Sequence, residues 1–194
     1  ESKQHDMTVA ERTLRVMHVI TGLDTGGAET QLLHLVGARR KAGADDRVVS
    51  MIAGGSLRTQ FERAGVPVHD LGMTRGRPSL RALLRLIALY RRYKPHLVQS
   101  WMYHADLMAL FALRISGRWE QTPLIWGIRC SDMNLKDYGR SLRWTVRLCA
   151  RYSHLPDVVI ANSEAGLEAH HKLGYRPFRS RVIDNGIDTQ KYRP

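Results

Sequence analysis

Short apolar segments alternate along this chain with longer segments in which apolar residues recur every three or four positions. The short segments are rich in β-branched residues, and several are apolar on both faces, which is typical of buried parallel strands. Seven strands are predicted, at 16–20, 47–52, 67–71, 97–101, 123–128, 157–161 and 181–183. The alternation predicts an α/β fold: a Rossmann-like, doubly wound parallel sheet with flanking helices.

The same series indicates how the chain is organised. No repeat and no long linker interrupts it, so residues 15–183 are expected to form one domain, a size that buries a substantial core. Residues 1–14 are polar and are expected to form a leader that is partly disordered. Residues 184–194 open with the turn-rich run DNGID and are expected to begin a linker to a further domain.

Composition adds one unusual feature, the charge. Hydrophobic residues make up 43% of the chain and charged residues 25%, as in an ordinary globular protein, but the net charge is +12. This excess predicts an anionic partner, which could be a phosphate-bearing small molecule, an acidic lipid surface or nucleic acid. No apolar stretch approaches the roughly 18 residues that span a bilayer, so no membrane span is expected. Two cysteines are too few for a disulfide framework, so a reducing cytoplasm is the expected location.

Metal-binding patterns are not apparent in the sequence. Cys130 and Cys149 lack the spacing of a zinc site or of a disulfide framework, and a reducing compartment suits them. His170 and His171 have no ligand partner three or four residues away, so they are interpreted as core or solvated histidines. No metal is expected.

The loop after the first predicted strand contains the strongest local motif, TGLDTGGAE at residues 21–29. A glycine turn at this position lets backbone N–H groups and a helix N-terminus approach a phosphate, although Gly26 and Gly27 would also serve a plain tight turn. Gly22 and Gly27 have the spacing of a P-loop, but Ala28 and Glu29 stand where Lys and Ser or Thr are required. The dinucleotide pattern G-x-G-x-x-G is also absent, so neither class of nucleotide-binding protein is predicted.

Five motifs, in order along the chain, resemble the retaining family 4 glycosyltransferases of GT-B architecture. They are GGAE at 26–29, WMYHAD at 101–106, WGIR at 126–129, ANSE at 161–164 and NGID at 185–188. The resemblance runs from about residue 15 to residue 194. It implies that the chain is one half of a GT-B enzyme, the N-terminal domain on the acceptor side of a cleft, and that a C-terminal domain holds most of the nucleotide-sugar donor. The isolated domain is then expected to be inactive.

The reaction implied by the resemblance moves a sugar from its nucleotide diphosphate to an acceptor hydroxyl, with retention at the anomeric carbon and without a metal or other cofactor. The implied setting is the synthesis of polysaccharide, glycolipid or another cell-envelope glycan. Negative charge develops on the leaving diphosphate, where preorganised donors contribute most to catalysis. The resemblance assigns Gly26 and Gly27 to the donor phosphate through their backbone N–H groups.

Polar residues at the ends of the middle strands are the candidate catalytic groups. His104 and Asp106 are expected to contact a sugar or acceptor hydroxyl, or alternatively to cap the following helix. Arg129 is expected to pair with an anionic part of donor or acceptor, or alternatively with Asp132. Further residues expected to line the cleft are Glu29, Trp101, Tyr103, Asn162, Ser163, Glu164 and Asn185. For Asn162 and Ser163, capping of the next helix is the favoured role.

Positive charge gathers on a predicted amphipathic helix that ends near residue 94. Its basic residues are candidates for a membrane surface, or they form the solvated face of a sheet-packing helix. The membrane-surface candidates are Arg81, Arg85, Arg91, Arg92 and Lys94. A second cationic face is expected on the helix that carries Arg140, Arg143, Arg147 and Arg151. Together they favour a peripheral enzyme at the inner face of the membrane that meets a lipid-linked or other glycan acceptor.

Two other classes of function are compatible with the charge. One is a noncatalytic Rossmann-like module that binds a nucleotide or another anion. The other is a basic nucleic-acid-binding protein, which is less favoured because no zinc finger, RNA-binding motif or aromatic stacking platform is present. The sequence therefore favours a glycosyltransferase domain over both.

Overall fold

The computed structural model describes residues 13–74, 77–130 and 139–186. Seven parallel strands form one sheet in the order β3-β2-β1-β4-β5-β6-β7. The strands are β1 (Arg15–Ile20), β2 (Asp45–Ile52), β3 (Val68–Met73), β4 (Leu97–Trp101), β5 (Leu124–Ile128), β6 (Val158–Ala161) and β7 (Ser180–Val182). The predicted fold class is confirmed, and each predicted strand lies within two residues of the observed one.

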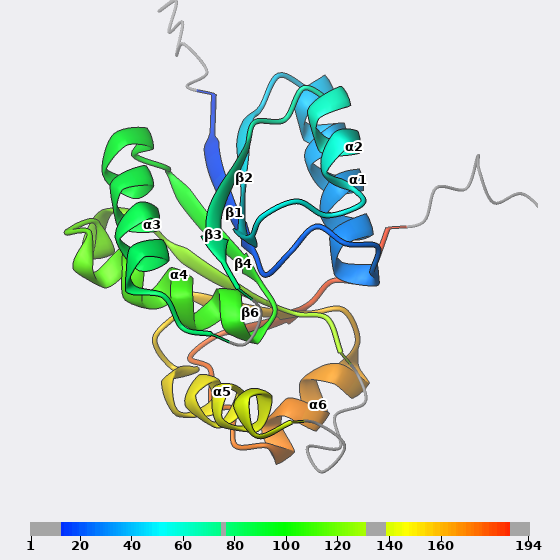
Figure 1. Cartoon of the computed structure of the whole chain (residues 1–194). Coiled ribbons are helices and arrows are strands. Elements are labelled where there is room, and N and C mark those ends of the chain that lie inside the picture. The colour runs from blue at the N-terminus through cyan, green and yellow to red at the C-terminus, as the bar shows by residue number, and fades with distance from the viewer. Residues whose placement is uncertain (1–12, 75–76, 131–138, 187–194) are drawn as a thin grey trace, which may run out of the picture.

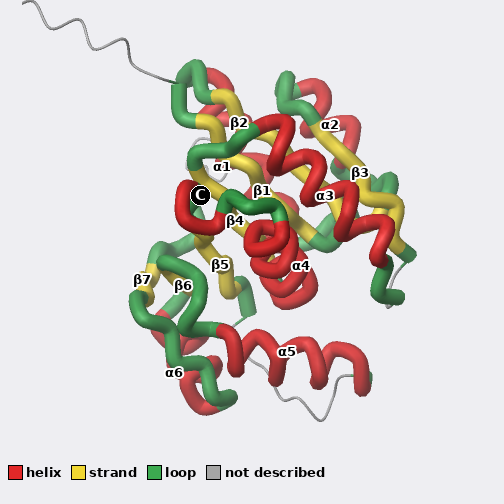
Figure 2. Tube along the Cα trace, turned by 90° about the vertical axis from the view of Figure 1, so that its left-hand side faces the viewer, coloured by secondary structure: helices red, strands yellow, loops and turns green. Residues whose placement is uncertain are grey.

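Helices cover the sheet on both sides. They are α1 (Gly27–Lys41), α2 (Arg58–Arg63), α3 (Leu80–Tyr93), α4 (Tyr103–Ile115), α5 (Arg140–Tyr152) and α6 (Glu164–Lys172), with a 3₁₀ turn, η1 (Trp119–Gln121). Figure 1 shows α1 and α2 on one side of the strands and α3 and α4 on the other. In Figure 2, α5 and α6 lie near the β5–β7 end of the sheet. Helix α4 packs against both α3 and α5.

The strand order reverses between β1 and β4, and this reversal positions the candidate site. The chain leaves β1 into α1 on one face of the sheet, and it leaves β4 into α4 on the other face. Loops that diverge in this way leave a crevice at the carboxyl ends of the strands. The close pairing of β4 with β5 there requires Gly127, because a Cβ on this residue would lie 2.9 Å from the carbonyl oxygen of Ser100.

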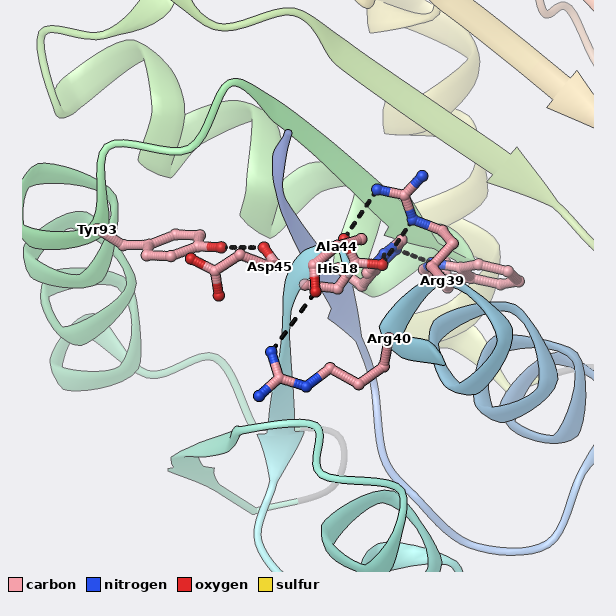
Figure 3. A network of polar contacts seen from close by, with 8 residues as sticks. His18, Arg39, Arg40, Ala44, Asp45 and Tyr93 are labelled. Carbon is pink, nitrogen blue, oxygen red and sulfur yellow. Dashed lines mark hydrogen bonds and ion pairs between the residues drawn. The ribbon is translucent and has the colours of Figure 1, made fainter. Parts of the chain in front are cut away.

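A buried polar network, which the sequence analysis did not anticipate, joins α1 to the first two strands (Figure 3). Arg39 on α1 donates from Nε and Nη2 to the carboxylate of Asp46 on β2, at 2.6 and 3.0 Å. His18 on β1 brings Nε2 within 3.7 Å of the same carboxylate, and its Nδ1 accepts from the indole N–H of Trp101 at 3.4 Å. Burial lowers the pKa of His18 despite the nearby carboxylate of Asp46, so the ring is neutral at pH 7.

Helix α3 packs on the sheet through its apolar stripe, as the sheet-packing interpretation expected. Two of its basic residues are bound to the protein's own backbone. Arg85 donates to the carbonyl oxygen of Leu71 at 2.8 Å, and Arg91 donates to that of Ser116 at 3.1 Å. Both side chains are nevertheless exposed, so the interpretation of Arg85 and Arg91 as membrane-surface candidates stays a prediction.

The other three candidates on this segment, Arg81, Arg92 and Lys94, are exposed as well. Across the three described ranges, no helix is both long enough and apolar enough to cross a bilayer. The predicted leader up to residue 12 and residues 187–194 of the predicted linker lie outside the described residues.

Candidate functional site

A cavity of about 1050 Å³ opens at the carboxyl ends of the first four strands, between α3, α4 and α5. Its walls include Ile20 at the end of β1, Thr21 after it, Met51 on β2 and Met73 on β3. The location is the one in which open α/β sheets bind ligands, and the size is at the upper end of the roughly 300–1,000 Å³ of small-molecule sites. Four of the predicted site residues line it: Glu29, Trp101, Tyr103 and His104.

The glycine turn lies beside this cavity. Gly26 is the N-cap of α1 in an extended conformation, and because glycine has no side chain, no side-chain hydrogen bond caps the helix. Gly27 is exposed, and a Cβ built on it would meet no atom within 4 Å. The carboxylate of Glu29 folds back toward Gly26, since it is the group that a Cβ there would strike. The start of α1 is therefore open to a ligand on the side of Gly27.

The turn from β4 into α4 is strained. Met102 has φ 73° and ψ 159°, a combination that is essentially confined to glycine and costs about 1–3 kcal/mol elsewhere. Met102 lines the cavity, and the α4 residues that follow it include His104. Burial lowers the pKa of His104, so a neutral imidazole, able to donate and accept hydrogen bonds, faces the cavity at pH 7.

Asp106 is placed differently from the prediction. Its side chain is 1% exposed, does not line the cavity and accepts a hydrogen bond from Ser100 Oγ at 2.6 Å. Burial raises the pKa of this carboxyl to about 7, against the hydrogen bonds from Ser100 and the backbone of Gly127. Asp106 therefore fastens α4 to β4 and β5, and its position does not support contact with a sugar.

Arg129 lies at the end of β5 as a cation without an acidic partner among the described residues. Its guanidinium carbon is 4.4 Å from the centre of the Trp101 ring, and Nη1 donates to Asn185 Oδ1 at 2.9 Å. Burial lowers the pKa of Arg129, which stays cationic because arginine titrates far above pH 7. The alternative partner, Asp132, lies outside the described residues. The structure thus joins Trp101, Arg129 and Asn185 into one cluster.

The segment that carries Asn185 is also tied to α1, because Gln31 Nε2 donates to the carbonyl oxygen of Gly186 at 3.1 Å.

The residues of the ANSE motif have separate roles. Ser163 caps α6, since its Oγ accepts from the backbone N–H of Gly166 at 3.0 Å, and the favoured capping role is confirmed for this residue. Glu164 is exposed on the first turn of α6, and Asn162 Oδ1 is buried without a hydrogen-bond partner among the described residues.

Tyr103 points partly into the core, where its hydroxyl lies 2.8 Å from His170 Nε2. Because His170 is buried and His171 is exposed, the interpretation of this pair as core and solvated histidines is confirmed. Within the described parts of the chain, no three His, Cys, Asp or Glu side chains come together in a way that could hold a metal ion.

Sequence reasoning missed Thr21 and Arg77, which line the cavity, and the strain at Met102. The position of Thr21, directly after a buried strand, was a usable signal. Nothing in the local sequence marks Met102, because its conformation follows from the packing of α4 against β4 and β5.

A comparison with family models matches residues 25–191 to Glycosyltransferase Family 4. Among solved structures, the chain is similar to that of Anabaena Alr3699/HepE in complex with UDP and glucose, with a TM-score of 0.74 and 20% identity over 92% of this chain and 46% of the other. A glycosyltransferase from Rickettsia africae is similar with a TM-score of 0.64 and 14% identity, over 92% of this chain and 45% of the other. Acinetobacter baumannii MurG is similar with a TM-score of 0.59 and 15% identity, over 90% of this chain and 47% of the other. No curated protein sequence matches this chain.

The structural matches are each below 25% identity and establish the fold, while the family match covers most of the chain. The chain spans about half the length of the solved structures that it matches. The parallel sheet, the glycine turn at its switch point and the family match lead to one conclusion: the chain belongs to glycosyltransferase family 4 and has the N-terminal Rossmann-like domain of a GT-B enzyme.

Proposed function

We propose that this chain is the acceptor-side half of an enzyme that transfers a sugar from a nucleotide-diphosphate sugar to an acceptor hydroxyl, with retention at the anomeric carbon. The observation that carries the proposal is the open start of α1, where the uncapped turn at Gly26 and Gly27 adjoins the cavity at the strand ends. Free amides at a helix N-terminus favour a phosphate. The similar structure of Anabaena Alr3699/HepE, solved with UDP and glucose, supports this choice of ligand.

Each of the grouped residues has a role in this proposal. The amides of Gly26 and Gly27 approach the diphosphate from the N-terminal domain. Arg129, held over Trp101 and bonded to Asn185, offers a cation to an anionic part of donor or acceptor. His104, neutral and facing the cavity, orients the acceptor hydroxyl. A second domain supplies most donor contacts, so the chain alone binds but does not turn over, and no metal is required.

The proposed setting is the synthesis of a cell-envelope glycan at the inner face of a membrane. Support comes from the exposed cations Arg81, Arg92 and Lys94 on α3 and from the exposed Arg140 and Arg147 on α5. Both helices pack on the same helix, α4. Acidic lipid head groups attract such a surface.

The test of the donor site uses Gly27, the first residue of α1, in an enzyme that joins this chain to a donor-binding domain. Gly27→Pro removes one N–H group yet suits the first helical position, and the extended conformation of Gly26 is the one that a residue before proline prefers. Because a charge-assisted hydrogen bond is lost, we expect kcat/KM for the nucleotide sugar to fall by about 10- to 100-fold.

Gly27→Ala is the matched control, because it keeps the N–H group and its Cβ meets no atom within 4 Å. It is expected to retain activity within about threefold, since no contact is lost. Equal activity of the Pro and Ala variants would show that the amide of Gly27 does not serve the donor. Failure of the joined enzyme to transfer sugar from any nucleotide sugar tested would contradict the proposed function.

A further inference from the structure

The cavity at the strand ends is predominantly apolar for most of its length. Besides Met51 and Met73 from the sheet, its wall is made by side chains from three helices. These include Leu80 and Leu83 of α3, Met108 and Phe111 of α4, and Leu142 and Leu148 of α5. Its polar groups lie mainly at the strand ends and at the start of α3. Apolar side chains line most small-molecule sites, but hydroxyls and phosphates gain little from them, so a wall as large as this one favours a ligand with a sizeable apolar part.

The apolar wall continues onto the surface of the protein. Leu80 is 71% exposed, Ile115 54%, Leu148 41% and Phe111 39%, and all four line the cavity. Leu84 and Trp144 are exposed beside them on α3 and α5, at 56% and 63%. Large exposed apolar side chains gathered at the mouth of a cavity mark a site that is covered by a ligand, a membrane or a partner. An extended apolar ligand could therefore enter from the side of α3, α4 and α5.

The charge around the cavity restricts the ligand further. Arg77 lines it, Arg81 is exposed one residue beyond Leu80, and Arg140 stands next to the lining residues Gly139 and Ser141. Glu29, at the strand ends, is the one acidic residue in the described lining. A long apolar groove with cations at its margin complements a molecule that combines a hydrocarbon chain with an anionic group.

We propose that this cavity holds the hydrocarbon chain of an acceptor lipid with a phosphate-ester head group, with the head group toward the strand ends and the arginines at the margin. The inference rests on the proposed function, to which it adds the class of acceptor. In this arrangement the hydrocarbon chain runs along α4 toward the exposed Ile115, at the end of α4 that is farther from the strand ends. The head group then lies at the edge of the sheet where His104 and the start of α1 are found.

The test measures binding of dodecyl phosphate to the purified chain by calorimetry, below the concentration at which this amphiphile forms micelles. We expect one site, with affinity at least about 100-fold above that of inorganic phosphate, because each buried methylene adds about 0.8 kcal/mol. Dodecanol should bind too, but more weakly. Arg77→Ala should weaken binding of dodecyl phosphate and leave binding of dodecanol unchanged. Arg92→Ala, which changes an exposed arginine on α3 that does not line the cavity, should change neither.

Two variants test the apolar wall. Phe111→Asp changes an exposed lining residue, and Met108→Trp fills the cavity without adding charge. Each should weaken the binding of dodecyl phosphate by about tenfold or more, since apolar contact is lost. Leu84→Asp is the matched control, because Leu84 is similarly exposed and does not line the cavity, and it should bind within about twofold. Thermal unfolding confirms that each variant is folded.

Absence of binding, or equal weakening by Leu84→Asp and Phe111→Asp, would overturn the inference. Alternatively, an apolar segment of a second domain covers the cavity. Dodecyl phosphate would then bind to this chain but not to the joined enzyme, and that result would also overturn the inference. Sugar transfer to a lipid-free acceptor by the joined enzyme separates the two proposals. Transfer without lipid binding leaves the proposed function intact and refutes the acceptor lipid, whereas lipid binding without any transfer refutes the proposed function.

Discussion

Asp106 illustrates how burial changes the chemistry of a single residue. A carboxyl shortly after a strand end invites assignment to catalysis, but this one, in the first turn of α4, is buried and hydrogen-bonded to Ser100. Its pKa rises to about 7 from an ordinary 3.8 because the charged form loses its water. A group whose pKa is raised on folding stabilises the protein fully below its unfolded pKa, and this contribution is lost as the pH rises through about 7.

Asp106→Asn should therefore make the protein more stable at alkaline pH. The amide stays neutral. The Ser100 hydroxyl can donate to the carbonyl oxygen of Ile125, 3.3 Å away, while its oxygen accepts from the amide N–H. The expected gain in the free energy of unfolding at pH 8 is about 2–4 kcal/mol, and it vanishes near pH 4. Urea denaturation across this range measures it. Glu120→Gln, exposed on η1, is the control for net charge, and a gain that does not depend on pH would contradict the explanation.

At the scale of the elements, α1 is attached to the sheet by charge as well as by apolar packing. Leu32 and Val36 fill the interface, while Arg39 in its last turn holds Asp46 on β2. Asp46 is fully buried and Arg39 about one-third exposed. Burial alone would raise the pKa of Asp46, but contacts with His18 and Arg39 lower it, so the carboxylate stays charged and needs its partner.

Arg39→Ala should cost about 2–3 kcal/mol in the free energy of unfolding, because it leaves a buried carboxylate without its main partner. This loss is at the low end for removing one partner of a buried ion pair, because water reaches the Arg39 side chain. Arg40→Ala removes an exposed neighbour that donates weakly to Ala44, at 3.5 Å, and should cost less than about 0.5 kcal/mol. Urea denaturation at pH 7 compares them, and equal losses would contradict a special role for Arg39.

At the scale of the whole molecule, the arginines of this basic protein serve different purposes. Some arginines hold the fold together, as Arg85 and Arg91 do on α3. Others, such as Arg81 and Arg92, are exposed on the side of the sheet where α3, α4 and α5 surround the opening of the cavity.

Binding to anionic vesicles should depend on that side of the molecule. Arg81→Ala with Arg92→Ala is expected to weaken sedimentation with anionic liposomes by about 10- to 30-fold, at about 1 kcal/mol for each basic residue near the surface. Arg40→Ala with Arg63→Ala, on α1 and α2 across the sheet, removes the same charge and should change it by less than about threefold. Equal retention of the unmodified chain on neutral and anionic liposomes would contradict a membrane-facing side.

Local pattern determined the elements of this protein. Runs of β-branched residues such as 158–161 and the apolar repeat of α3 could be read from the sequence, since strand and helix formation depend on near neighbours along the chain. The glycine turn was found in the same way, because a strand followed by Gly26-Gly27 and an amphipathic helix is itself a local signal.

Only the tertiary structure decided which residues act together. Arg129 meets Asn185, 56 residues away, and Trp101 reaches His18 across 83 residues, because β1, β4 and β5 are neighbours in the sheet. The same packing buried Asp106 and opened a cavity among three helices whose sequences share no motif. Burial and proximity between distant segments arise from how whole elements pack, and these two quantities separate the residues of the site from those of the core.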